Sequence, residues 1–301
     1  MSGVSTVGPV LVTGGSGFLG RALCAALLAR GESVVVFDLA PPKAPIRHDA
    51  IRYETGDIRD LSALSEVAGR HGIRAIVHLA ALVIPACRAN PVLGAEVNII
   101  GHINVLELAR MTGISRVVYT SSLAAKPRGA LASPVNLYGA YKHCCEEISK
   151  VYFLDHGIAS VGLRPNVVYG PGRIEGETAA ITQVIRAAAT GESYEMPFSG
   201  EMCFQHIDEV TEIFLRCLAA TPDGPVVSDL TTDVRSTADL LAAILRLAPD
   251  ARVDAAPVHR AGPKGLDNAP LRDLIGDWAA VPLEEGVART LAAFRDGGGE
   301  S

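Results

Sequence analysis

Short apolar runs rich in β-branched residues alternate with longer amphipathic stretches through the first half of the chain. The runs predict six strands, at Pro9–Thr13, Ser33–Phe37, Ile51–Thr55, Ala75–Leu79, Arg116–Thr120 and Ser160–Leu163. The stretches between them predict helices over Phe18–Arg30, Leu61–His71, Pro91–Met111 and Ala140–His156. Runs that are apolar at nearly every position are typical of strands covered on both faces. The alternation therefore predicts an α/β fold with a doubly wound parallel sheet.

This regular alternation ends near Arg164, where proline and glycine begin to interrupt the chain. Beyond that point the pattern predicts one strand and three helices, at Pro225–Leu230, Ala179–Ala189, Thr237–Leu247 and Leu283–Phe294, and a loop over Ala256–Pro270. We expect residues 1–164 to form the sheet domain, to which segments near 204–230 return. Residues 165–301 are expected to form mainly a smaller C-terminal α/β lobe that binds the substrate.

Composition and charge narrow the class of protein. Of 301 residues, 49% are hydrophobic and 20% charged, which is ordinary for a globular protein and excludes a disordered one. The net charge of −6 argues against a nucleic-acid partner, which needs a basic surface. We find no basic leader and no apolar run near the roughly 18–20 residues of a membrane span. The six cysteines lack metal or redox spacing, and the eight histidines lack ligand spacing, so we expect a cytoplasmic protein without a metal site.

A glycine-rich loop joins the first predicted strand to the first predicted helix. It comprises Gly14, Gly15, Ser16, Gly17, Phe18, Leu19 and Gly20, and it satisfies both GxGxxG and GxxGxxG. In such a loop one glycine makes the tight turn, one lets the backbone approach a pyrophosphate, and one lets the helix pack closely. The helix N-terminus then offers N–H groups and a favourable dipole to the anion. The loop predicts a Rossmann-type dinucleotide site.

Asp38, at the end of the second predicted strand, indicates which dinucleotide is bound. A carboxylate here accepts hydrogen bonds from the adenosine ribose hydroxyls and repels a 2′-phosphate. No arginine follows it directly. We therefore expect NAD in preference to NADP. Asp57 and Ile58, after the third strand, lie where an adenine ring could be flanked.

Tyr138 and Lys142 are four residues apart at the start of a predicted helix and so share one face of it. A neighbouring ammonium and the positive charge of an oxidised nicotinamide favour the phenolate, which can take a proton from a substrate alcohol as hydride leaves its carbon. Ser122, shortly after the fifth strand, could hold the same substrate oxygen. These three residues are the candidate catalytic set.

The motifs together resemble the extended short-chain dehydrogenase/reductases, or NAD-dependent epimerase/dehydratase family, of the UDP-glucose 4-epimerase type. Besides the glycine loop and the YxxxK pair, the resemblance rests on HLAA (78–81), EVNIIGHINVLELAR (96–110), LRPNVVYGP (163–171) and FQHIDEV (204–210). It implies that Lys142 also binds the nicotinamide ribose and that Asn98 supports the active-site helix. It also implies cofactor contacts at Leu79, Ala80, Ala81, Asn98 and Pro165. In many relatives the helices that correspond to Pro91–Met111 and Ala140–His156 form a four-helix bundle between the two subunits of a dimer.

Two departures from the family pattern narrow the expected chemistry. Ser122 is followed by Leu123-Ala124, where the sugar-nucleotide dehydratases carry an Asp-Glu pair. Met202 stands where many sugar-nucleotide epimerases carry an arginine that clamps the diphosphate. The segment between Pro171 and Phe204 is also short for a nucleotide pocket. Asn166, Arg173, Thr178 and Ser122 are the candidate substrate contacts, and Arg173 could pair with a carboxylate.

Three hypotheses follow, in order of preference. The first is an NAD-dependent oxidoreductase that takes hydride from a secondary alcohol of a small sugar, sugar acid or other polyhydroxy compound. The second is a UDP-hexose 4-epimerase that uses the same residues and keeps NAD bound. The third is a non-catalytic NAD-sensing protein, although such proteins commonly lose the Tyr–Lys pair.

Overall fold

The chain folds into two units that we describe separately. The structure, a computed structural model, describes residues 7–174 and 176–297. The first unit comprises residues 1–164, 211–229 and 269–277, and the second comprises residues 165–210, 230–268 and 278–301. The first unit therefore takes its sheet strands from two distant parts of the chain.

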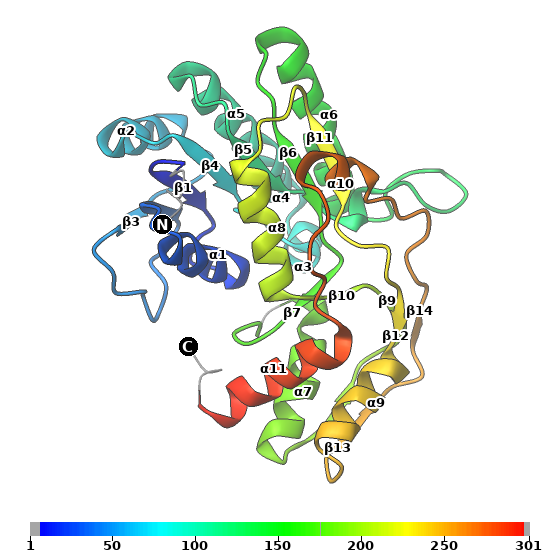
Figure 1. Ribbon diagram of the computed structural model, residues 1–301. Helices are drawn as coiled ribbons and strands as arrows, with labels where there is room; N and C mark the ends of the chain where they lie inside the picture. The colour runs from blue at the N-terminus through cyan, green and yellow to red at the C-terminus, as the bar shows by residue number, and fades with distance from the viewer. Residues whose placement is uncertain (1–6, 175, 298–301) are drawn as a thin grey trace. The chain divides into compact units, whose positions relative to one another are not determined.

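A seven-stranded sheet forms the centre of the first unit (Figure 1). Its strands are β1 (Val10–Thr13), β2 (Val34–Asp38), β3 (Ile51–Thr55), β4 (Ala75–His78), β5 (Val117–Thr120), β6 (Val161–Arg164) and β11 (Val226–Asp229). Their order across the sheet is β11-β6-β5-β4-β1-β2-β3, and every pair is parallel. The order reverses at β1, which pairs with both β2 and β4. The predicted doubly wound parallel sheet is confirmed.

Helices cover this sheet. They are α1 (Phe18–Ala29), α2 (Leu61–His71), α3 (Ile84–Ala89), α4 (Pro91–Ala95), α5 (Gly101–Thr112), α6 (Leu137–His156) and α10 (Ala269–Ile275). Leu11 and Val35 of the strands pack with Leu64 of α2 and Leu106 of α5 in one apolar cluster. The intervening strand residues, such as Val34, are buried on the opposite face because side chains alternate along a strand. Arg30, the C-cap residue of α1, pairs with Glu212 of α8 (Ile207–Ala219).

The prediction of a helix over Pro91–Met111 is confirmed, with one local irregularity. A π-helical turn, Glu96–Ile100, joins α4 to α5, so helical structure runs from Pro91 to Thr112. This stretch is long and apolar enough to cross a membrane, with a mean hydropathy of 1.3 over its best window. A search for uninterrupted apolar runs misses it because polar residues divide it. Half of that window is buried inside the protein, so packing within the chain accounts for part of its apolar character.

The second unit is built from small sheets and three longer helices. Its strands are β7 (Val167–Tyr169), β8 (Ser193–Met196), β9 (Ser199–Met202), β10 (Phe204–His206), β12 (Arg235–Ser236), β13 (Arg252–Ala255) and β14 (His259–Arg260). They pair as β10-β7, β12-β9-β14 and β13-β8. The helices α7 (Ala180–Thr190), α9 (Thr237–Leu247) and α11 (Leu283–Arg295) enclose an apolar cluster with them.

Several elements differ from the sequence prediction. Helix α6 begins at Leu137 and not at Ala140, because the Asn136 side chain caps it by accepting a hydrogen bond from the Gly139 N–H at 2.8 Å. The pattern does not predict α8, and the expected loop over Ala256–Pro270 contains β14. The two residues of β14 are too few to create a periodic pattern, and they are defined by pairing with β9.

We predict that the cluster between the sheet and α5 carries much of the stability of the first unit. Leu106→Ala removes a fully buried side chain, so the free energy of unfolding should fall by about 2–5 kcal/mol. Leu131→Ala, at a side chain 87% exposed, is the matched control and should change it by less than about 0.5 kcal/mol. Urea unfolding without added cofactor measures both. Equal losses in the two variants would contradict the assignment of this core.

Candidate functional site

The glycine loop lies at the carboxyl end of β1, where the strand order reverses. Gly14 has a φ of +69°, and a side chain there would lie 2.6 Å from the Ala80 backbone nitrogen. A side chain on Gly20 would overlap the Gly14 carbonyl and the Gly15 backbone. Glycine is therefore required for both the turn and the close packing of α1 on it. Beyond the carboxyl ends of parallel strands, such a reversal is where open α/β sheets bind ligands.

The start of α1 is suited to an anion. Its N-cap, Gly17, has no side chain to satisfy the first N–H groups, and its first turn contains no acidic residue. A side chain added at Gly17 would meet only the Gly14 oxygen, at 3.4 Å. The loop thus leaves room for a ligand against the positive end of the helix dipole. This cradle fits the pyrophosphate of the predicted dinucleotide.

Asp38 ends β2 beside this loop. Its Oδ2 accepts a hydrogen bond from the Ser16 N–H at 3.0 Å, and its Oδ1 accepts one from the Leu39 N–H at 2.8 Å. The Ser16 hydroxyl donates to the Ala40 carbonyl at 2.8 Å. The carboxylate is thereby held next to the turn that would carry the pyrophosphate, which is the arrangement that ribose recognition requires.

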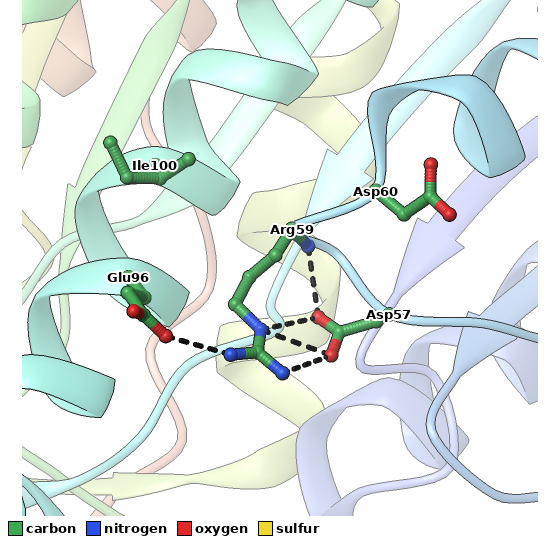
Figure 2. Close-up of a pocket in the computed structure, with 5 residues that line it drawn as sticks. All are labelled: Asp57, Arg59, Asp60, Glu96 and Ile100. Carbon is green, nitrogen blue, oxygen red and sulfur yellow. Dashed lines mark hydrogen bonds and ion pairs between the residues drawn. The ribbon is translucent and has the colours of Figure 1, made fainter.

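Asp57 and Arg59 are bonded to each other and line a surface pocket of about 430 Å³ together with Glu96 (Figure 2). The Arg59 side chain donates to both Asp57 oxygens, at 2.7–3.1 Å, and to Glu96 Oε2 at 2.7 Å. The Arg59 guanidinium holds the pKa of the Asp57 carboxyl below its usual value. Ile58 is instead buried below the surface, and its carbonyl accepts a hydrogen bond from Asn104 at 3.0 Å.

The segment after β4 is attached to the glycine loop by hydrogen bonds. The Leu79 N–H donates to the Thr13 carbonyl at 3.0 Å, and the Ala80 N–H donates to the Thr13 hydroxyl at 3.4 Å. Ala81 follows directly. The Asn98 side chain accepts a hydrogen bond from the Leu82 N–H and donates one to the Leu82 carbonyl. The backbone carbonyl of Asn98 accepts a hydrogen bond from the Cys145 thiol of α6 at 3.1 Å. Asn98 thus connects the π-helical turn to α6 and to the segment after β4.

Ser122, Tyr138 and Lys142 come together at the carboxyl end of β5. Ser122 is extended, with a φ of −164°, and its Oγ accepts a hydrogen bond from the Ala124 N–H at 3.1 Å. The first turn of α6 packs against this segment, since a side chain on Gly139 would overlap the Ala124 carbonyl. Tyr138 lies in that same turn. The structure therefore brings the three predicted residues to one end of the sheet.

Lys142 is buried beneath this group. Its ammonium donates to the Thr120 carbonyl at 2.6 Å and lies 5.9 Å from the centre of the Tyr138 ring. Only 3% of the residue is exposed, and this burial lowers the pKa of the Lys142 ammonium below its usual value. In a poorly solvated position its charge acts strongly on a nearby phenolate.

The second unit contains the remaining predicted residues. The Asn166 side chain accepts a hydrogen bond from the Cys203 N–H at 2.9 Å, and Pro165 precedes it. Arg173 donates to the Val168 carbonyl and to the Thr178 hydroxyl, the latter at 2.7 Å. Arg173 and Thr178 are thus partners of each other within this unit.

Sequence reasoning missed Arg260. Its guanidinium stacks 4.0 Å from the centre of the Phe198 ring and pairs with Glu177 at 3.2 Å, next to Thr178. The pairing of β14 with β9 brings it there, and no local motif marks it. Met202, by contrast, is 5% exposed and lies in the apolar cluster of this unit.

Comparison with known proteins gives sequence relatives along the whole chain. Residues 10–228 match the model of the NAD dependent epimerase/dehydratase family. A UDP-glucose 4-epimerase from Mycolicibacterium smegmatis is 29% identical over 95% of this chain and 98% of its own length. Another, from Rhizobium meliloti, is 34% identical, but the match covers only 60% of each chain. A D-erythronate dehydrogenase from Haemophilus influenzae is 29% identical over 64% of this chain and 66% of its own.

A solved structure extends the likeness to the fold. The GalE-like L-threonine dehydrogenase from Cupriavidus necator is 26% identical, with a TM-score of 0.84 over 94% of this chain and 99% of that one. The expectations of an NAD-dependent enzyme and of the extended short-chain dehydrogenase/reductase type are confirmed. Because the family match extends over more than half of its length, the chain belongs to the NAD dependent epimerase/dehydratase family.

Proposed function

We propose that this enzyme takes hydride from a secondary alcohol of a small sugar, sugar acid or other polyhydroxy compound that carries no nucleotide. The main observation in support of this proposal is that Met202 is buried in the apolar cluster of the second unit. At that position the chain offers no cation to a diphosphate, which would be costly to bury without one. The guanidinium groups of Arg173 and Arg260 already have partners within the same unit.

In the proposed reaction each catalytic residue has one task. Tyr138 takes the proton of the substrate hydroxyl on its phenolate oxygen. Ser122 donates a hydrogen bond to the same substrate oxygen. Its Oγ accepts a hydrogen bond from the Ala124 N–H, and that bond does not use the hydroxyl hydrogen of Ser122, which serves as the donor. Lys142 stabilises the phenolate by its buried positive charge. Because burial lowers the pKa of Lys142, its ammonium loses the proton at a lower pH than that of an exposed lysine. NAD, when bound, accepts the hydride.

A UDP-hexose 4-epimerase is the second candidate function. It is supported by relatives named UDP-glucose 4-epimerase, of which the Mycolicibacterium smegmatis protein matches over nearly its whole length. The named substrate of the Haemophilus influenzae relative, D-erythronate, is instead a small sugar acid and supports the first candidate. Both functions use the same cofactor and the same three catalytic residues, so the product distinguishes them.

We predict net NADH formation from a substrate without a nucleotide. The enzyme is incubated with NAD and panels of free sugars, sugar acids and UDP-sugars, while absorbance at 340 nm and product stereochemistry are followed. Tyr138→Phe should abolish turnover and leave the NAD dissociation constant within about threefold, because only the proton acceptor is removed. Inversion of a UDP-sugar without net NADH would refute the first function, and unchanged turnover in Tyr138→Phe would refute the proposed base.

We propose that Asp38 sets the preference for NAD through the ribose hydroxyls. Hydrogen bonds to a charged group contribute about 1.5–3 kcal/mol, so Asp38→Ala should raise the NAD dissociation constant about ten- to a hundredfold. Affinity for NADP should rise or stay constant, because the repulsion of a 2′-phosphate is removed. Titration calorimetry measures both, with the exposed Asp49→Ala as control. Unchanged NAD affinity in Asp38→Ala would rule out this role.

We also propose a cytoplasmic homodimer that binds neither membranes nor nucleic acid. Among the described residues the six cysteines of the chain form no disulfide, as is usual in reducing compartments. The helical stretch Pro91–Thr112 exposes Val92, Ile100 and Met111, and α6 exposes Val151 and Leu154. Exposed apolar side chains gathered on two long helices support association through these helices.

Leu154, at 79% exposure, should be central to that association. We expect Leu154→Glu to convert a dimer to a monomer in light scattering, because a carboxylate would have to be buried in the interface. Leu131→Glu, at a loop position 87% exposed, should leave the dimer intact. A wild-type protein that scatters as a monomer at micromolar concentration would exclude the homodimer.

A further inference from the structure

A buried group of two carboxylates and two cations lies behind Ser122 in the first unit. The side chains of Glu146 and Asp229 are each 1% exposed, and those of Arg164 and Lys126 are about 20% exposed. Arg164 Nε donates to Glu146 Oε1 at 2.7 Å, and its Nη1 lies 3.7 Å from Asp229 Oδ1. Lys126 Nζ donates to Asp229 Oδ2 at 2.6 Å. The two negative and two positive charges balance.

This group touches both ends of the short segment that carries Ser122. At one end the Ser121 hydroxyl donates a hydrogen bond to Glu146 Oε1. At the other end Lys126, which follows the 3-10 turn Leu123–Ala125, forms an ion pair with Asp229. Arg164 joins the two carboxylates. The segment 121–126 is therefore fixed at each end by a buried carboxylate, and the two carboxylates are coupled through one guanidinium.

Glu146 also belongs to the helix of the catalytic pair. It lies one turn after Lys142, which lies one turn after Tyr138, so the three share a stripe along α6. Ser121 and Ser122 are neighbours in an extended stretch, where consecutive side chains point to opposite sides. Holding the Ser121 side chain against α6 consequently sets the direction of the Ser122 side chain relative to Tyr138.

We infer that Glu146 is a positioning residue for Ser122, acting through Ser121 and through the Arg164–Asp229–Lys126 connection. Its carboxylate itself makes no substrate contact in this role. A buried ion pair contributes little net stability compared with apolar packing, but loss of one partner leaves a buried charge without its counterpart. The placement of this group around Ser122 points to orientation of a reacting side chain. The inference rests on the proposed role of Ser122.

Glu146→Gln is the informative variant, because it keeps the size and an acceptor for Ser121 while removing the charge that Arg164 requires. On whichever substrate the enzyme turns over, we expect kcat to fall about ten- to a hundredfold, with KM and the NAD dissociation constant within about threefold. Glu32→Gln is the matched control. Glu32 is a buried carboxylate of the same unit that accepts from Val7 and Gly8, and its variant should leave kcat within twofold.

A double-mutant cycle with Ser122→Ala separates positioning from a structural role. If Glu146 acts through Ser122, then Glu146→Gln in the Ser122→Ala background should lower kcat by less than threefold further. A merely structural role would lower kcat by the same factor in both backgrounds, and that result would overturn the inference. Unchanged kcat in Ser122→Ala alone would overturn both the proposed role of Ser122 and the inference.

Two further measurements test the role of Glu146 even if Glu146→Gln folds poorly or no substrate is found. Ser121→Ala removes only the hydroxyl link, and it should lower kcat about three- to tenfold with the same lack of additivity. Hydrogen exchange needs no substrate: amides of residues 121–126 should exchange at least tenfold faster in Glu146→Gln than in Glu32→Gln, with β1 unchanged. Equal exchange in the two variants would contradict the anchoring of this segment.

Discussion

The reversal of strand order at β1 is the constraint on which the rest of the first unit depends. Because β1 pairs with β2 on one side and β4 on the other, the strand order reverses at β1, and open α/β sheets bind ligands beyond the carboxyl ends of the strands at such a reversal. The glycine loop, Asp38 and the segment after β4 all leave the sheet at this edge. Close backbone approach at Gly14 and Gly20 keeps the start of α1 against this edge.

Burial strengthens the interactions between charged side chains at the carboxyl end of β5. Lys142 lies in a poorly solvated position, where its charge acts on Tyr138 more strongly than it would at the surface. Behind it, Glu146 and Asp229 are compensated by Arg164 and Lys126. The helix α6 thus carries, on successive turns, a candidate proton acceptor, its cationic neighbour and an anchor for the segment of Ser122. One helix therefore supplies both the charge next to Tyr138 and the contact that orients the segment of Ser122.

Periodicity predicted the seven sheet strands of the first unit, because most of their residues are buried. In the second unit the same reasoning predicted α7, α9 and α11 but none of the strands, of which β12 and β14 have two residues each and exist only by pairing with β9. It also missed α8, whose residues follow an irregular stretch. The start of α6 was placed three residues late because capping by Asn136 is a local hydrogen bond that apolar periodicity does not detect.

Local spacing in the sequence determined the sheet strands of the first unit, the glycine loop and the pairing of Tyr138 with Lys142, because these features depend on residues close together in the chain. The tertiary structure alone decided which distant residues became partners. Arg164 joins Glu146 to Asp229 only because β6 and β11 are adjacent strands, and Arg260 reaches Glu177 only because β14 joins β9. Met202 turns toward an apolar cluster through the packing of its unit. Such contacts arise from strand order and burial, which no short stretch of sequence encodes.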